Sequence, residues 1–248
     1  MMIGVLSQWQ DELGSDDCQE VTAAASALVD AGYHVDAEAL TRARQCLLSS
    51  RGRFRAALAR AYLHLLDPLR GSAEAESLLR HDSNPEVRSE AFRALVDFGE
   101  RALPVLRQLT RSHDATVRWY AYRATSRLSG VEALPVLVAG LNDDDPTTRL
   151  AVAYELSARG AAALGPTLQA IATEPPSAGF HHAARIVLRR VTPPALRGQT
   201  ERLLAVLRGP WPAFEAPFVA RQLLDGLLRA AVVVAEDAAL AAPAGARA

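Results

Sequence analysis

The sequence contains no lysine, and all 27 basic residues in the 248-residue chain are arginine. Schiff-base catalysis and a Walker-type phosphate loop both require a lysine amine, so neither chemistry is available. Alanine, arginine, leucine and glycine are abundant, and a bias in base composition is a simple explanation of the missing lysine. The absence therefore narrows the chemistry without indicating a function.

Cysteine is almost as scarce, since only Cys18 and Cys46 occur and neither belongs to a metal-binding or redox motif. We therefore expect both cysteines to be reduced and the protein to be cytoplasmic. The formal net charge of −1 supplies no general attraction to nucleic acid or to an anionic membrane.

Targeting segments, membrane spans and short catalytic motifs are also missing. The first residues lack the basic and long apolar regions of a signal peptide. The most apolar late stretch, 223–240, contains four charged residues, which disfavours a membrane-spanning helix. The chain shows no Ser-His-Asp, HExxH, glycine-rich phosphate loop or CxxC pattern. We expect no cofactor and no membrane contact.

What the sequence does contain is an internal repeat. Three segments align from their starts, at residues 84–95, 114–125 and 145–156, and their arginines Arg88, Arg118 and Arg149 lie 30 and 31 residues apart. Each segment is followed by a second apolar stretch with a proline, and these prolines recur every 31 residues at Pro104, Pro135 and Pro166. A fixed period of this length predicts stacked helical repeats.

The residue types that recur in the three copies have physical roles. Each copy begins with a residue that can cap a helix, and the caps are Asn84, Asp114 and Asp145. Apolar residues at helical spacing follow, and in the first copy they are Val87, Ala91, Ala94, Leu95 and Phe98. The glycines Gly99, Gly130 and Gly160 are expected to end the first helix in a left-handed conformation. The unit is therefore predicted to be a helix, a tight turn and a second helix.

The pattern resembles the short HEAT-like repeats of the phycobilisome-lyase type, through the starts [N/D]-x-x-[V/T]-R-x-x-[A/V] and the ALPVL second helices. The resemblance implies an all-α, right-handed α-solenoid of about five to six antiparallel helix pairs. We expect N-terminal capping helices in residues 1–50, a repeat array in 51–240 with its clearest copies in 84–176, and a disordered tail in 241–248.

An aromatic and apolar stripe is the first candidate binding site. On a helical wheel of about 100° per residue, Trp119 lies nearly opposite the predicted core face, and Leu150 holds the same position in the next copy. Tyr122 and Phe92 lie on the neighbouring strip. Exposed aromatic residues frequently anchor interfaces, so these four residues are candidates for partner binding. The alternative is that Trp119 packs against a neighbouring helix.

The motif arginines Arg88, Arg118 and Arg149 flank the core face and have a different expected role. We expect them to hold carboxylates or carbonyls of the preceding loop, such as those of Asp143 or Asp144, and thereby to form a structural ladder with the three caps.

Two further groups of polar residues occur near residue 190. His181 and His182 are adjacent, which is poor geometry for joint metal binding, and we expect no metal site. A group of six arginines faces a single acid, Glu201, and could bind an anion or an acidic peptide; a solvated helix face is the alternative. Its members are Arg185, Arg189, Arg190, Arg197, Arg202 and Arg208.

The leading functional hypothesis is a non-catalytic interaction or scaffold module that binds another protein or a peptide, in an oligomeric state that the sequence leaves open. The alternative is an enzyme or enzyme accessory, because the resemblance extends to proteins that attach bilin chromophores and to proteins that excise alkylated bases from DNA. The second helices predict a mixed rather than a basic inner surface, so nucleic acid is disfavoured as a partner.

Overall fold

The computed structural model describes residues 2–33, 35, 40–173 and 177–241, and these residues form only helices and connecting segments. The fold is all-α, as predicted. The short 3-10 helices are η1 (Gly99–Ala102), η2 (Gly140–Asn142), η3 (Gly160–Ala163) and η4 (Pro194–Leu196). Contacts divide the chain into two compact units, Met1–Ala133 and Leu134–Ala248. This division falls inside the array expected for residues 51–240.

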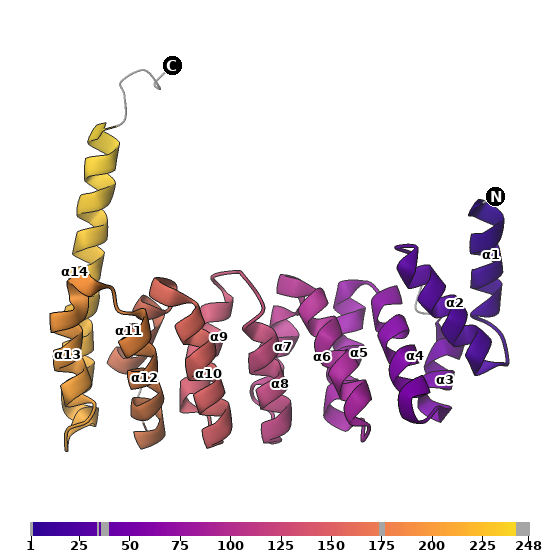
Figure 1. Ribbon diagram of the computed structural model, residues 1–248, viewed down its shortest axis with the longest axis horizontal. Helices are drawn as coiled ribbons and strands as arrows, with labels where there is room; N and C mark the ends of the chain where they lie inside the picture. Colours follow the sequence, from indigo (N-terminus) through magenta and orange to yellow (C-terminus); the bar gives the residue numbers. More distant parts are fainter. Residues whose placement is uncertain (1, 34, 36–39, 174–176, 242–248) are drawn as a thin grey trace. The chain divides into compact units, whose positions relative to one another are not determined.

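The first unit is a row of helices that pack in chain order (Figure 1). The first helices of successive pairs, α2, α4, α6 and α8, lie side by side, and α5 packs against α4, α6 and α7. The helices are α1 (Met2–Glu12), α2 (Cys18–Asp30), α3 (Thr41–Ser49), α4 (Gly52–Leu65), α5 (Pro68–His81), α6 (Pro85–Asp97), α7 (Leu103–Leu109) and α8 (Ala115–Thr125). This stacking is that of a HEAT-like solenoid, in which each helix pair covers the apolar face of its neighbour.

The second unit continues the same arrangement. Here α10 packs along α12, α11 packs along α14, and α13 packs on α14. The helices are α9 (Ala133–Ala139), α10 (Pro146–Ala158), α11 (Leu164–Thr173), α12 (Ala178–Val191), α13 (Arg197–Val206) and α14 (Pro212–Ala241). In chain order the array contains five successive pairs, from α4 and α5 to α12 and α13. The right-handed winding stays a prediction.

The apolar residues that recur at helical spacing in the sequence form the buried face of each helix. On α6 the residues Val87, Ala91, Ala94 and Leu95 are fully buried. Phe98, which the sequence placed in the same set, is only half-buried because it follows the last turn of α6. Its ring lies beside that of His64, with 5.8 Å between the ring centroids. The seam between neighbouring helices is built from leucine and alanine, whose small and medium side chains permit close stacking.

The caps lie where the sequence placed them, whereas one of the three glycines does not behave as expected. Side-chain oxygens of Asn84, Asp114 and Asp145 accept backbone amides in the first turn of α6, α8 and α10. Gly99 and Gly160 have φ of +62° and +59°, the left-handed region in which glycine is favoured. Gly130 does not adopt a positive φ. Its amide instead donates to Oε1 of Glu100, at 2.7 Å.

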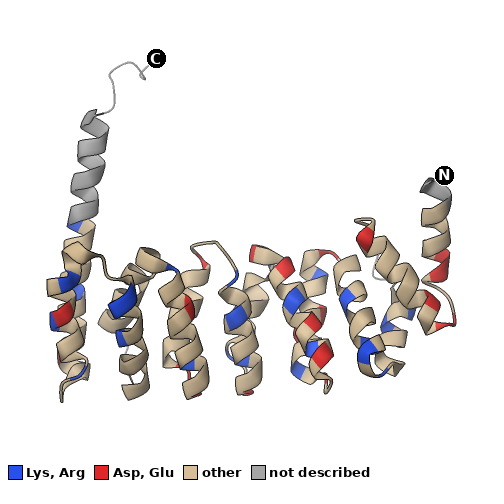
Figure 2. Ribbon diagram, viewed as in Figure 1, with Lys and Arg blue, Asp and Glu red and all other residues tan. Residues whose placement is uncertain are grey.

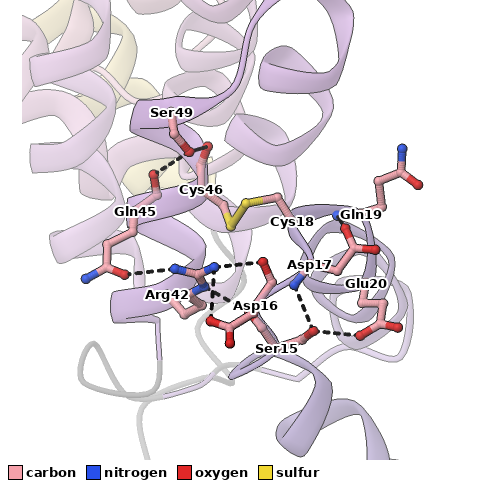
Figure 3. A network of polar contacts seen from close by, with 10 residues as sticks. All are labelled: Ser15, Asp16, Asp17, Cys18, Gln19, Glu20, Arg42, Gln45, Cys46 and Ser49. Atoms are coloured by element: carbon pink, nitrogen blue, oxygen red, sulfur yellow. Dashed lines mark hydrogen bonds and ion pairs between the residues drawn. A yellow bond between two sulfur atoms is a disulfide. The ribbon is translucent and has the colours of Figure 1, made fainter.

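The expectation of unpaired cysteines is wrong, because Cys18 and Cys46 form a disulfide between α2 and α3. Arg42, one turn before Cys46, donates to the carbonyl oxygens of Ser15 at 2.9 Å and Asp16 at 2.8 Å (Figure 3). Both interactions join α3 to the segment that leads into α2. Because disulfides persist mainly in oxidising compartments, the bond removes the basis on which a cytoplasmic location was expected.

Two expectations concern the ends of the chain. The capping helices expected in residues 1–50 correspond to α1, α2 and α3. The tail expected for 241–248 begins at the last residue of α14, and residues 242–248 lie outside the described residues. Over the described ranges, no helix has both the length and the apolar character needed to cross a membrane.

Candidate functional site

The motif arginines hold the loops that precede their own helices. Nη1 of Arg118 donates to the carbonyl oxygens of Ser112 at 2.9 Å and His113 at 3.2 Å. Nη1 of Arg149 donates in the same way to the carbonyls of Asp143 and Asp144. The acceptors lie six and five residues before the arginine in both repeats. These are charge-assisted bonds to backbone oxygens, and they fix the turn between successive repeats.

The third motif arginine is different. The Nε atom of Arg88 is buried and has no hydrogen-bond partner in the structure. In this region Arg55 of α4, rather than Arg88, contacts the buried carboxylate of the loop before α6. Arg55 forms an ion pair with Asp82. Asp82 also accepts the amide of Asn84, the residue that caps α6.

In the first unit, Trp119 belongs to an aromatic cluster rather than to an isolated exposed stripe. Trp119 is half-buried, and its ring meets the edge of Tyr120 at a centroid separation of 5.1 Å. The guanidinium of Arg123, one turn later, lies 4.7 Å from the Trp119 ring centroid, in cation–π geometry. The ring of Phe92 on α6 also lies beside that of Tyr120, with 5.7 Å between the ring centroids.

The predicted stripe requires one correction, because Tyr122 is buried, with 6 % of its surface exposed. Its neighbours on the wheel, Ala121 and Thr125, are fully buried. The buried face of α8 is therefore wider than the sequence pattern predicted, and it includes the Tyr122 ring. Tyr120, which the sequence analysis did not single out, joins Phe92 to Trp119 instead.

Leu150 lies in the second unit and lines a groove between α10 and α12. The groove has a volume of about 260 Å³. Its lining residues are Pro146, Arg149, Leu150, Gly179, His182, Ala183 and Ile186. Leu150 is 41 % exposed, and Tyr154, one turn further along α10, is 45 % exposed. An apolar floor with charged residues at its edge is the usual composition of a surface that binds other molecules.

The groove follows from matched spacing on two neighbouring helices. Pro146, Leu150 and Tyr154 are four residues apart on α10, and His182, Ile186 and Arg190 are four residues apart on α12. Residues at this spacing share one helix face. The rows meet beyond the groove as well, because the guanidinium of Arg190 lies 4.7 Å from the ring centroid of Tyr154. The groove therefore lies between two helices that pack along each other.

Gly179 allows Arg149 to form one wall of this groove. A Cβ atom on Gly179 would lie 2.7 Å from the Arg149 guanidinium carbon, closer than real side chains approach. We expect Gly179→Ala to displace the guanidinium from the carbonyls of Asp143 and Asp144 and to lower the free energy of unfolding by about 1–2 kcal/mol. Urea unfolding checks this. Gly165→Ala is the matched control, since a Cβ there meets nothing within 4 Å; equal losses in both variants would contradict the account.

The comparison with family models agrees with this architecture. Residues 72–157 match the family model described as HEAT repeats. The matched segment, which is less than half of the chain, is similar to HEAT repeats. It contains α6, α8 and most of α10, together with all three motif arginines and their caps. A comparison with curated proteins gives no match. A crystal structure of an engineered protein is similar to the chain, with 21 % identity over 75 % of this chain and 96 % of that one and a TM-score of 0.36.

A cluster of positive charge lies on α12, beyond the matched HEAT segment. Arg185 and Arg189 are one turn apart, and Arg208 follows the end of α13. Figure 2 marks the basic and acidic positions of the described helices in blue and red. Among the described residues, the arginines of α12 and α13 form no ion pair with a carboxylate within 4.0 Å. In the described part of the chain, His181 does not join other histidine, cysteine or acidic residues in a group that could hold a metal ion.

A second apolar surface, at the start of α14, escaped the sequence analysis. Trp211, Phe214 and Phe218 are 63 %, 80 % and 61 % exposed, and the first two rings lie 6.5 Å apart. Their spacing of three and four residues places them on one helix face, and this spacing could have revealed them.

Proposed function

We propose that the chain is a non-catalytic interaction module that binds a protein or peptide along the outer edges of its HEAT repeats. The observation that carries the proposal is the α10–α12 groove, where Leu150 and Tyr154 remain exposed beside a preformed apolar floor. HEAT repeats provide rigid and extended surfaces without the need for a catalytic constellation. The partner is not specified by the fold, because the same repeat serves unrelated functions.

The physical basis is a contact that needs little reorganisation. The backbone on both sides of the groove is helical, and Arg149 is fixed by two loop carbonyls. A partner that inserts an apolar side chain between Leu150 and Ile186 would therefore bury surface without first ordering a loop. In the first unit, the Trp119–Arg123 pair offers a second anchor of the residue types that dominate binding energy at interfaces.

The test is affinity capture with the purified full chain and with variants that change each surface. We expect Leu150→Asp to reduce recovery of the groove partner at least about tenfold, because it places a charge against the apolar floor. Trp119→Ala tests the first-unit cluster separately. The partner is then purified, and its dissociation constant for each variant is measured by calorimetry.

Leu69→Asp is the matched control, because Leu69 is 73 % exposed and belongs to neither surface. Circular dichroism verifies that each variant is folded. Equal recovery of every partner by wild type, Leu150→Asp and Trp119→Ala would count against both surfaces. The bilin-attachment and base-excision alternatives rest on sequence resemblance alone.

A further inference from the structure

Four cationic or polar residues lie on α12 and just after α13. His181, Arg185 and Arg189 are spaced four residues apart on α12 and share one face. Arg208 follows α13, and its charge acts on Arg185. Burial decreases along the row, from His181 to the exposed Arg189.

The buried part of this cluster has polar atoms that no protein group satisfies. His181 is 94 % buried, since only 6 % of its surface is exposed, and its Nε2 atom has no hydrogen-bond partner in the structure. The Nε atom of Arg185 is also buried without a partner. An unpaired buried donor costs free energy, and such groups are rare in folded proteins. Arg185 Nε is a donor, and His181 Nε2 is a donor in one of the two tautomers of a neutral imidazole. A ligand with several acceptor oxygens would satisfy both atoms.

The charge of the cluster is also uncompensated. Helix α12 contains no acidic residue, and Glu201 is the one acid of α13. Burial lowers the pKa of Arg185, and the neighbouring charges of Arg189 and Arg208 lower it further. Burial alone lowers the pKa of His181. Separating these arginines, or placing a carboxylate among them, would stabilise the fold. Their retention without a carboxylate therefore indicates a functional role.

We infer that His181, Arg185, Arg189 and Arg208 form a binding site for a phosphate monoester. A phosphorylated side chain carries close to two negative charges and three strong acceptor oxygens, which can accept from several guanidinium groups at once. A carboxylate offers two oxygens and one charge, and would leave part of the cluster unpaired. His181 is the buried member of the site, and Arg189 and Arg208 are its exposed members. The inference does not depend on the groove proposed above.

Calorimetric titration of the full chain tests the inference with three probes: a Gly-Gly-phosphoserine-Gly-Gly peptide, its unphosphorylated form and inorganic phosphate. We expect the phosphopeptide to bind and the unphosphorylated peptide not to bind. Arg185→Gln and Arg189→Gln should each weaken binding about tenfold or more, because each removes a charged hydrogen bond. Arg189 is exposed, so its variant keeps the test valid if Arg185→Gln does not fold.

Arg197→Gln is the matched control, since Arg197 is an exposed arginine at the start of α13 and its change in net charge is the same. Its affinity should stay within about threefold of wild type. Tighter binding of the peptide than of inorganic phosphate assigns the site to a phosphorylated partner, and equal binding assigns it to the phosphate group alone. Equal losses in Arg189→Gln and Arg197→Gln overturn the inference. Tighter binding of a 20-base-pair duplex DNA, lost in Arg189→Gln, also overturns it.

The same titration separates this inference from the proposed function. Leu150→Asp changes the groove on the neighbouring face of α12 and should leave phosphopeptide affinity within about threefold of wild type. Arg189→Gln should in turn leave capture of a groove partner unchanged if that partner carries no phosphate. Failure of one proposal is therefore visible while the other holds.

Discussion

Reduction of the Cys18–Cys46 disulfide is expected to lower the free energy of unfolding of the first unit by about 3–4 kcal/mol. The bond joins positions 28 residues apart, and in the chain-entropy description a closed loop of this length restricts the unfolded chain by that amount. Much of the effect should fall on α2 and α3, which pack against each other and against α4. Urea unfolding followed by circular dichroism, with and without a phosphine reductant, measures the difference.

The double variant Cys18→Ser/Cys46→Ser is the control for the reductant. Its unfolding midpoint should equal that of the reduced wild type and should not respond to the reductant. Because the sequence has no other cysteine, a thiol assay of the native protein reports this bond alone. Two reactive thiols in the native state, or an unfolding midpoint that ignores the reductant, would contradict the disulfide.

Truncation of Phe180 should destabilise the second unit by about 3–5 kcal/mol, the cost of removing a fully buried aromatic side chain. Phe180 is 1 % exposed and is the largest side chain so deeply buried in the described residues. It lies at the start of α12, which packs on α10 and α11, and its ring contacts His181 with a centroid separation of 6.2 Å. Phe180→Ala should therefore also loosen the groove and the arginine cluster.

Phe218→Ala provides the comparison, because it makes the same chemical change at a side chain that is 61 % exposed. Its effect on the free energy of unfolding should remain within about 0.5 kcal/mol. Both variants are measured by urea unfolding under identical conditions. A loss in Phe180→Ala no larger than that in Phe218→Ala would show that α12 is not anchored by this ring.

The helices and their caps could be predicted from the sequence because both depend on local interactions. The caps Asn84, Asp114 and Asp145 accept amides two or three residues away, so the sequence contains donor and acceptor together. The contacts of Arg118 and Arg149 are equally local, at five and six residues. A period of about 31 residues then determines which helices become neighbours.

The candidate binding surfaces were harder to predict because they depend on the distances between neighbouring helices. Whether Tyr122 is buried depends on how closely α8 meets its neighbours, and the helical wheel gives only its direction. The groove at Leu150 requires Gly179, 29 positions later, to make room for Arg149. Pairing of Cys18 with Cys46 depends in the same way on the approach of α2 and α3. None of these distances is encoded in a short motif.

The surface ion pairs of the first unit and the arginine cluster of the second imply responses to ionic strength in opposite directions. In the first unit, surface pairs such as Arg44–Glu74 and Arg107–Glu132 are attractive, and dissolved salt weakens attractions of this kind. In the second unit, the mutual repulsion of Arg185, Arg189 and Arg208 is what salt relieves. Concentrated electrolyte should therefore loosen the N-terminal helices while it tightens the C-terminal ones.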